Sequence, residues 1–213
     1  MRMPHPTPTA NPLPFEHFRG GITDDLGAPA GFAEIALSGP AVAQFDDLLH
    51  ELYPDAARVD QSRLQQLAAW LLSLPEEQAQ DELDARLGRV EELRALTQDP
   101  AWDCDEPTRM RIGKLLDYVD REDDLIPDSL KLLGLLDDVL LIELSWPAFA
   151  QEASEYRDFC EYRSTERPEG SPEEQREAWM RDRLAELEIL RQQTRISDEH
   201  FAGYTQEYQL RVK

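Results

Sequence analysis

Four aspartates lie in one short stretch of the sequence: Asp124, Asp128, Asp137 and Asp138. Carboxylate oxygens are the ligands that the hard cations Mg²⁺ and Ca²⁺ take in proteins. The first two acids precede a predicted helix, and the last two lie on it. If the loop folds back along that helix, all four carboxylates could converge on one ion. The pattern therefore offers a metal site for Mg²⁺ or Ca²⁺.

A structural interpretation of the same acids needs no ion. Asp124 would close a turn, and Asp128 would cap the helix predicted from Ser129 to about Ser145. Asp137 falls on the apolar side of that helix, where an ionised carboxylate must be paired, hydrogen-bonded, metal-bound or protonated. The preceding helix supplies three candidate cations for such a pair: Arg109, Arg111 and Lys114. We favour this interpretation and expect no resident cofactor.

These residues also carry a family resemblance. The run Asp124-Leu-Ile-Pro-Asp128, followed by Gly134 and by Asp137-Asp138, resembles the DLIPD…G…DD signature of the YkvA-like family, a bacterial domain family of unknown function. Tyr118 stands where that family often has an aromatic residue. The resemblance covers about residues 112–146. It implies an α-helical hairpin, often described as membrane-associated, and no established reaction.

The hairpin departs from the family pattern at two places. Glu122 stands where the family usually has proline, and Ser129-Leu130-Lys131-Leu132 replaces an apolar segment that contains proline. Both differences make the hairpin more polar. The most apolar stretch, Leu125 to Trp146, holds five charged residues, and each would cost roughly 2.5–3.5 kcal/mol at the centre of a bilayer. We therefore expect no membrane-spanning helix and no membrane partner.

The remaining reactive side chains indicate no reaction. No serine lies in a GxSxG elbow. Cys104 lies between two aspartates, which disfavour its thiolate. The histidines form no recognisable ligand set; they are His5, His17, His50 and His200. We expect no catalytic residue and no enzymatic activity.

Charge and cysteine content narrow the function classes. The chain of 213 residues has 44 acidic and 22 basic side chains, for a formal net charge of -22. Nucleic acid would meet a repulsive field, so we expect no nucleic-acid partner. The only cysteines, Cys104 and Cys160, are far apart and form no disulfide framework, which is typical of a reducing compartment. Met1 to Pro14 has five prolines and no apolar core of a secretory signal, so we expect a cytoplasmic protein.

The residues named above lie on or beside predicted helices. Apolar residues recur at helical spacing from Pro40 onward, and no alternating strand pattern appears. Asp60, Asp105 and the capping box Ser171-Pro-Glu-Glu174 mark helix starts. The predicted helices cover Ala41 to Tyr53, Asp60 to about Leu74, Pro75 to Gln98, Asp105 through Val119, Ser129 to Ser145, Pro147 to about Arg163, Ser171 to Thr194, and a short last helix from Ser197.

The sequence thus predicts an all-α fold, a compact multi-helix bundle of about seven to eight helices with a flexible Pro-rich N-terminal arm. Residues 1–36 are expected to form this Pro/Gly-rich arm. Residues 37–213 are expected to form a single helical domain that contains the YkvA-like hairpin at about 112–146.

A binding role remains. The acidic helix from Pro75 to Gln98 and the capped helix from Ser171 to Thr194 could each offer a surface to a partner, although each is also explained as a solvated outer face. We expect a soluble, non-catalytic protein-interaction or scaffold module with a protein partner, and homo-oligomerisation stays open. One alternative is a metal-binding enzyme or sensor that uses the four aspartates. Another is peripheral membrane attachment through Leu125 to Trp146.

Overall fold

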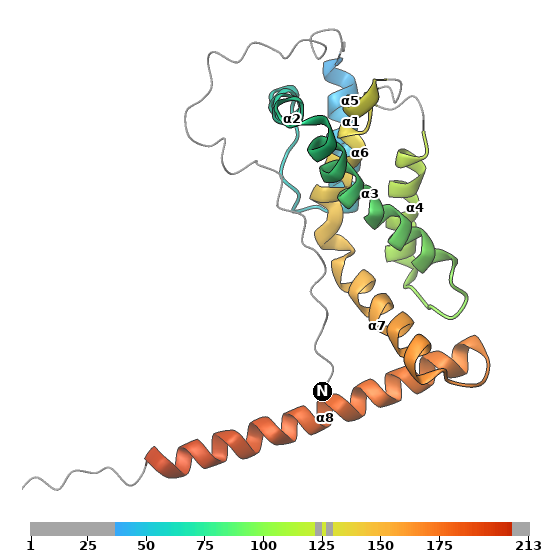
Figure 1. Cartoon of the computed structure of the whole chain (residues 1–213), viewed down its shortest axis with the longest axis vertical. Coiled ribbons are helices and arrows are strands. Elements are labelled where there is room, and N and C mark those ends of the chain that lie inside the picture. Colours follow the sequence, from blue (N-terminus) through green and yellow to red (C-terminus); the bar gives the residue numbers. More distant parts are fainter. Residues whose placement is uncertain (1–36, 122–124, 127–129, 206–213) are drawn as a thin grey trace, which may run out of the picture. The chain divides into compact units, whose positions relative to one another are not determined.

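The computed structural model describes residues 37–121, 125–126 and 130–205, and it describes their side chains except at Lys131 and residues 195–205. Within these ranges the chain forms helices joined by turns and loops and contains no strand, which confirms the all-α prediction. The arm predicted over residues 1–36 lies outside them. The elements, drawn in Figure 1, are α1 (Gly39–Leu52), α2 (Gln61–Ser73), α3 (Glu76–Gln98), α4 (Glu106–Val119), α5 (Lys131–Gly134), α6 (Leu136–Ser145), η3 (Trp146–Ala148), α7 (Ala150–Glu166) and α8 (Pro172–Thr205).

The predicted capping residues begin their helices. Asp60 and Asp105 each accept a hydrogen bond from the backbone N–H three residues later, at 2.9 and 3.0 Å. Ser171 and Glu174 form the predicted capping box: the Ser171 N–H donates to Glu174 Oε2 at 2.7 Å, and the Glu174 N–H donates to Ser171 Oγ at 3.3 Å. These bonds satisfy N–H groups that a helix start leaves without an intrahelical partner.

The helix boundaries differ from the prediction at several places. Pro75 is the N-cap of α3 rather than its first helical residue. The helix expected from Ser129 to Ser145 is divided into α5 and α6, because Leu135 takes φ -90° and ψ 3° between them, directly after the poor helix former Gly134. The separate last helix from Ser197 is absent, since α8 continues to Thr205. No proline or glycine interrupts the sequence between residues 173 and 202.

Contacts group the described residues into two compact units, whereas the sequence predicts one helical domain over residues 37–213. Unit 1 holds the described residues up to Asp99 together with Cys104–Glu155, and unit 2 holds Pro100–Asp103 with the described residues from Tyr156 onward. The boundary falls inside α7. Asp137 and Asp138 belong to unit 1.

Unit 1 is built around α6, which contacts α1, α2, α3 and α4 (Figure 1). Apolar side chains lie on nearly every side of α6, so that the helix has no polar face turned to solvent. Its buried apolar residues are Leu136, Val139, Leu140, Leu141 and Ile142. A helix surrounded in this way carries any polar side chain into the interior with it, and Asp137 and Asp138 are such side chains.

Unit 2 is centred on four aromatic side chains. Trp102 contacts Tyr156, Phe159 and Trp179 with ring centroids 5.5 to 5.6 Å apart, and Phe159 and Trp179 are 5.6 Å apart in an edge-to-face arrangement. The indole N–H of Trp179 donates to Asp158 Oδ2 at 3.0 Å. This cluster fixes the first two turns of α8 against α7.

Candidate functional site around Asp137

Asp137 has no solvent exposure, and one of its oxygens accepts three hydrogen bonds. The Tyr118 hydroxyl on α4 donates to Asp137 Oδ2 at 2.7 Å. The backbone N–H groups of Leu125 and Ile126 donate to the same oxygen at 3.1 and 3.3 Å. The carboxylate therefore ties the segment at residues 125–126 to both α4 and α6.

The prediction that a cation from the preceding helix pairs with Asp137 is wrong. That helix does supply the partner, but the partner is the Tyr118 hydroxyl. The three candidate cations are engaged elsewhere: Lys114 pairs with Glu51, Arg111 donates to Thr108 Oγ1 at 3.0 Å, and Arg109 donates to the Cys104 carbonyl at 3.4 Å. A phenol satisfies a buried carboxylate without the desolvation of a second charge.

Burial raises the pKa of Asp137 to about 6, while the hydrogen bonds from Tyr118 and from the backbone N–H groups act in the opposite direction. The second oxygen, Oδ1, has no hydrogen-bond partner among the described residues. A carboxyl group with this pKa exchanges its proton near neutral pH. Because its bonded oxygen already accepts three donors, the group is better suited to holding the loop than to attacking a substrate.

Of the other three predicted metal ligands, Asp138 lies among the described residues. Asp138 is also buried, with 2% of its surface exposed, in the first turn of α6. Asp124 and Asp128 lie outside the described residues, so the convergence of the four carboxylates stays a prediction. Within the part of the chain that the structure describes, no three His, Cys, Asp or Glu side chains are grouped as metal ligands. The groups around Asp137 Oδ2 are N–H and O–H groups that donate hydrogen bonds to it, rather than oxygen ligands of a cation.

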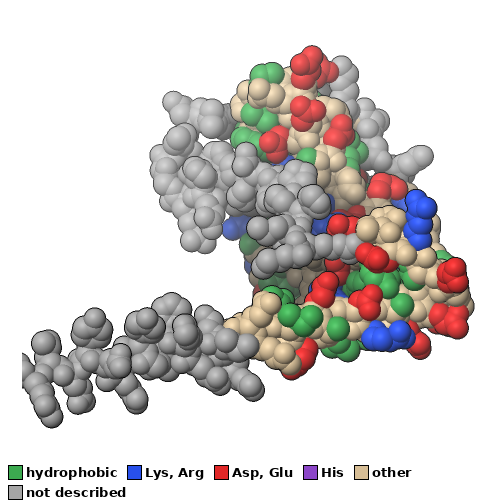
Figure 2. Space-filling view, turned by 60° about the horizontal axis from the view of Figure 1, so that its bottom comes forward, with side chains coloured by type: hydrophobic (Ala, Val, Ile, Leu, Met, Phe, Trp, Pro, Cys, Tyr) green, Lys and Arg blue, Asp and Glu red, His purple; other side chains and the backbone are tan. Residues whose placement is uncertain are grey.

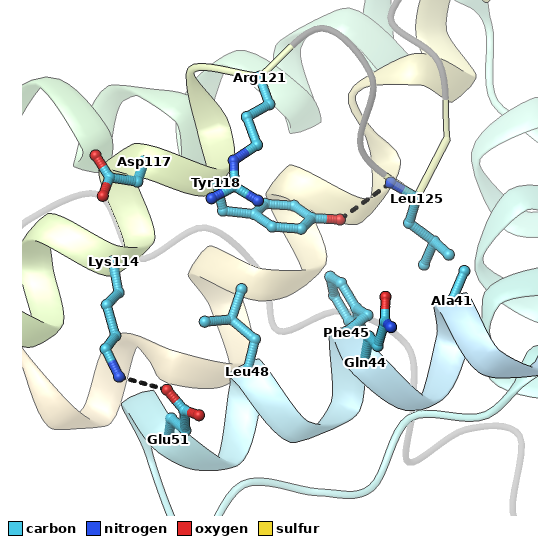
Figure 3. A pocket seen from close by; sticks show the side chains of 10 residues that line it. All are labelled: Ala41, Gln44, Phe45, Leu48, Glu51, Lys114, Asp117, Tyr118, Arg121 and Leu125. Carbon is cyan, nitrogen blue, oxygen red and sulfur yellow. Dashed lines mark hydrogen bonds and ion pairs between the residues drawn. The ribbon is translucent and has the colours of Figure 1, made fainter.

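A pocket of about 440 Å³ lies between α1 and α4, on the other side of Tyr118 (Figure 3). Phe45 and Tyr118 form part of its lining and meet edge-to-face with centroids 5.7 Å apart. The Tyr118 hydroxyl is directed to the Leu125 N–H, as the dashed line in Figure 3 shows, so the pocket meets the ring of this residue. Lys114 and Glu51 neutralise each other in the lining. The rest of the lining mixes apolar side chains with Gln44, Asp117 and Arg121, and this mixture identifies no ligand for the pocket.

Arg86 on α3 is a buried charged residue that the sequence analysis missed. Its side chain has no exposure; it donates to Glu82 Oε2 at 2.6 Å, and its Nε lies 3.5 Å from Glu143 Oε2 on α6. Arg89 donates to the same Glu143 oxygen at 2.7 Å. The signal was present, because Arg86 lies three residues after Leu83 on the apolar stripe of the helix. This group fixes α3 to α6 and does not border the pocket.

The cysteine and histidine of the described core are structural. Burial raises the pKa of Cys104 to about 12, and the nearby Glu152 carboxylate adds to this effect, so its thiol is inert as the sequence predicted. His50 contacts the backbone carbonyls of Asp46 and Ala56 at 2.6 and 3.1 Å. Both residues therefore serve packing and hydrogen bonding in unit 1.

Most apolar side chains of α6 are not available to lipid. Leu136, Val139, Leu140, Leu141 and Ile142 are buried in unit 1 and Leu144 is half-buried, and among the described residues from 130 to 146 Leu130 is the large apolar side chain with substantial exposure, at 38%. Among the described residues, no helix has both the length and the apolar composition that crossing a bilayer requires.

Most of the exposed large apolar side chains among the described residues lie on α8. Met180, Leu184, Leu187 and Leu190 follow one another at spacings of four, three and three residues, which places them on one side of the helix, and 44 to 64% of each is exposed. Ile189 is also exposed, on the opposite side. Figure 2 shows green side chains beside charged ones along the described part of α8. We call the four residues the α8 stripe.

Every described residue of α8 from Leu184 to Thr194 is exposed. By contrast, the acidic helix α3 contacts α2, α4, α5 and α6, and its stripe of Leu83, Val90, Leu93 and Leu96 is buried in the core. Of the two helices that the sequence offered as partner surfaces, α8 is thus the one whose apolar side is uncovered.

No protein-family model matches the chain, and neither a curated protein nor a solved structure is significantly similar to it. The class of protein is therefore defined by the fold alone, as an all-α protein.

Proposed function

We propose that the chain is a non-catalytic, soluble helical protein of the cytoplasm, and that it acts as an interaction or scaffold module by binding another protein through α8. We also propose that it is of the YkvA-like type, on the motif from Asp124 to Asp138. The bond between Tyr118 and Asp137 supports the second proposal, because it gives the aromatic position of that motif a structural role.

The observation that carries the interaction role is the α8 stripe. Helices of fewer than about 12–15 residues are marginal in water, and most helical stability in proteins comes from packing of an apolar face. Among the described residues nothing packs on the turns of α8 from Leu184 to Thr194, although they carry Leu184, Leu187 and Leu190 on one side. A partner that covers this side would supply the missing stabilisation.

The chemistry around the buried acids supports a non-catalytic role. The Asp137 oxygen that is bonded holds a loop, the Arg86 group joins two helices, and the thiol of Cys104 is kept protonated. In each case the buried polar residue has a role in the stability of unit 1. Arg86 and Cys104 do not border the pocket between α1 and α4, whereas Tyr118 and Leu125, two of the donors to Asp137, lie in its lining.

Photo-crosslinking in the cells that naturally express the chain tests the interaction role. p-Benzoylphenylalanine would replace Leu184 in the full chain, and the matched control would carry it at Ile189, which is equally exposed but on the opposite side of α8. We expect a discrete crosslinked protein, identified by mass spectrometry, from position 184 and much less of it from position 189. Equal or absent crosslinks at the two positions would contradict the proposal.

A further inference from the structure

We propose that the partner of the α8 stripe is a second copy of this chain, and that the two α8 helices run parallel in a two-stranded coiled coil. This inference rests on the proposed function and names the occupant of the same surface. Its basis is the position of the charged residues that flank the stripe.

The stripe fits the seam of a coiled coil. Met180 and Leu187 are seven residues apart, and Leu190 follows Leu187 by three, so that the first two occupy a positions and Leu190 a d position of a heptad repeat. Arg183 occupies the preceding d position, but it is bonded to Asp158 of α7, which draws it out of the seam. The apolar contact would therefore centre on Leu187, with Leu184 beside it.

The charged residues that flank the α8 stripe in one copy are complementary to those in a second copy. With Leu187 at a, Glu186 takes the g position and Arg191 the following e position. In a parallel two-stranded coiled coil, the g residue of one helix faces the following e residue of the other. A twofold axis would therefore form two Glu186–Arg191 pairs at once. Within one chain, neither side chain forms an ion pair among the described residues.

The local charge balance also favours a second copy over a basic partner. From Met180 to Thr194 the helix carries three arginines and three acidic residues, whereas the whole chain has a net charge of -22. Two such acidic chains repel each other over most of their surfaces. The α8 stripe lies in a stretch where that repulsion is locally balanced, and a basic helix would find no local excess of negative charge there.

Sedimentation velocity of the full chain over a range of concentrations at fixed salt tests the inference. We expect a reversible species of twice the 24.5 kDa chain mass. Leu187→Glu should weaken the association about tenfold or more, because it places two charges in the apolar seam. Ile189→Glu introduces the same charge on the opposite side and should leave the association nearly unchanged. Both residues are exposed in one chain, so neither variant threatens folding.

A charge exchange tests the register. Glu186→Arg and Arg191→Glu should each weaken the dimer, and the double variant should restore it, because the exchanged pair again joins opposite charges. A chain that stays monomeric at all concentrations, a dimer that survives Leu187→Glu, or a double variant without recovery would overturn the inference.

The crosslinks from position 184 separate this inference from the proposed function. Crosslinks between two copies support both. Crosslinks only to a different protein keep the interaction role and overturn the second copy, and the absence of position-specific crosslinks overturns both.

Discussion

The Tyr118 hydroxyl lies 2.7 Å from Asp137 Oδ2, and this contact joins α4 to the first turn of α6 in the interior of unit 1. The same oxygen holds the backbone at residues 125–126. The stability of unit 1 should therefore depend on the protonation of Asp137 and on the Tyr118 hydroxyl, in ways that can be measured separately.

The first prediction concerns pH. Because the pKa of Asp137 is raised to about 6, the folded chain binds more protons than the unfolded chain between about pH 4 and pH 6. Stability from the protonated group is therefore fully present below pH 4 and is lost as the pH rises through 6. Relative to Asp137→Asn, the free energy of unfolding should fall by about 2 kcal/mol between pH 4 and pH 7, measured by urea titration.

Asp120 provides a control of opposite sign. Its hydrogen bond from Arg94 lowers its pKa, so comparison with Asp120→Asn should show stability gained, not lost, as the pH rises through the acidic range. A difference between the wild type and Asp137→Asn that stays constant from pH 4 to pH 7 would show that Asp137 does not titrate as its burial implies.

The second prediction concerns the hydroxyl of Tyr118. Tyr118→Phe removes a donor to a buried carboxylate and should cost about 2 kcal/mol of unfolding free energy at pH 7. In the Asp137→Asn background the cost should be smaller, and the double-mutant cycle gives the coupling between the two residues. Tyr162→Phe is the matched control, because Tyr162 donates to the exposed Asp182 at 3.2 Å; it should cost less than about 1 kcal/mol. Additive effects at Tyr118 and Asp137 would contradict the coupling.

The third prediction concerns the ion group around Arg86. Replacing both Glu82 and Glu143 by Gln deprives a fully buried guanidinium of its two carboxylates and should cost about 3–5 kcal/mol. Arg86→Met should cost less, since the two glutamates are partly exposed and Arg89 still pairs with Glu143. Chemical denaturation compares these variants.

The ion pair of Arg94 with Asp120 on the surface provides the control for the variants of the Arg86 group. Arg94→Met breaks an exposed ion pair and should change stability by about 1 kcal/mol or less. If Arg86→Met proves costlier than the double glutamate variant, the guanidinium contributes mainly through packing, and the ionic account of this group fails.

The fourth prediction concerns the metal alternative. An ion that binds only the folded chain at about 100 times its Kd raises the free energy of unfolding by about 2.7 kcal/mol. We expect no such rise with Mg²⁺ or Ca²⁺ in thermal melts, compared with NaCl of equal ionic strength, because any salt screens the net charge of -22. A metal-specific rise that Asp124→Asn and Asp128→Asn together abolish would establish the ion site.

The fifth prediction concerns membranes. Since most apolar side chains of α6 are buried in unit 1, the chain should remain in the soluble fraction when it is floated with vesicles of neutral or anionic lipid. Flotation that is lost in Leu130→Glu, a change at the exposed leucine of this region, would instead support peripheral attachment.

The helical fold could be predicted from the sequence because its signals are local. Asp60, Asp105 and Ser171 mark helix starts, because each accepts a hydrogen bond from the backbone N–H only three residues later. The burial of Asp137 was equally predictable, since helical spacing alone places it among leucines. The continuation of α8 past residue 197 was not, because Ser197 and Asp198 also fit a new helix start.

The partners of the buried charges could not be predicted, because they depend on how helices meet. Helix α4 was correctly named as the source of a partner for Asp137, but Arg109, Arg111, Lys114 and Tyr118 lie within three turns, and only the rotation of α4 decides which side chain faces α6. Arg86 was missed for a related reason. An arginine on an apolar stripe can be buried only if a carboxylate lies beside it, and Glu143, which lies beside Arg86, is 57 residues away in the sequence.

Pro100–Asp103 belongs to unit 2 although the chain on both sides of it belongs to unit 1. No single cut can then separate the two units. A proteolytic fragment that ends near residue 155 would retain the Trp102 indole but lose Tyr156, Phe159 and Trp179, the rings that cover it. Such a fragment would present bare indole to water and should be prone to aggregate, so the shortest well-behaved piece of this protein must extend into α8.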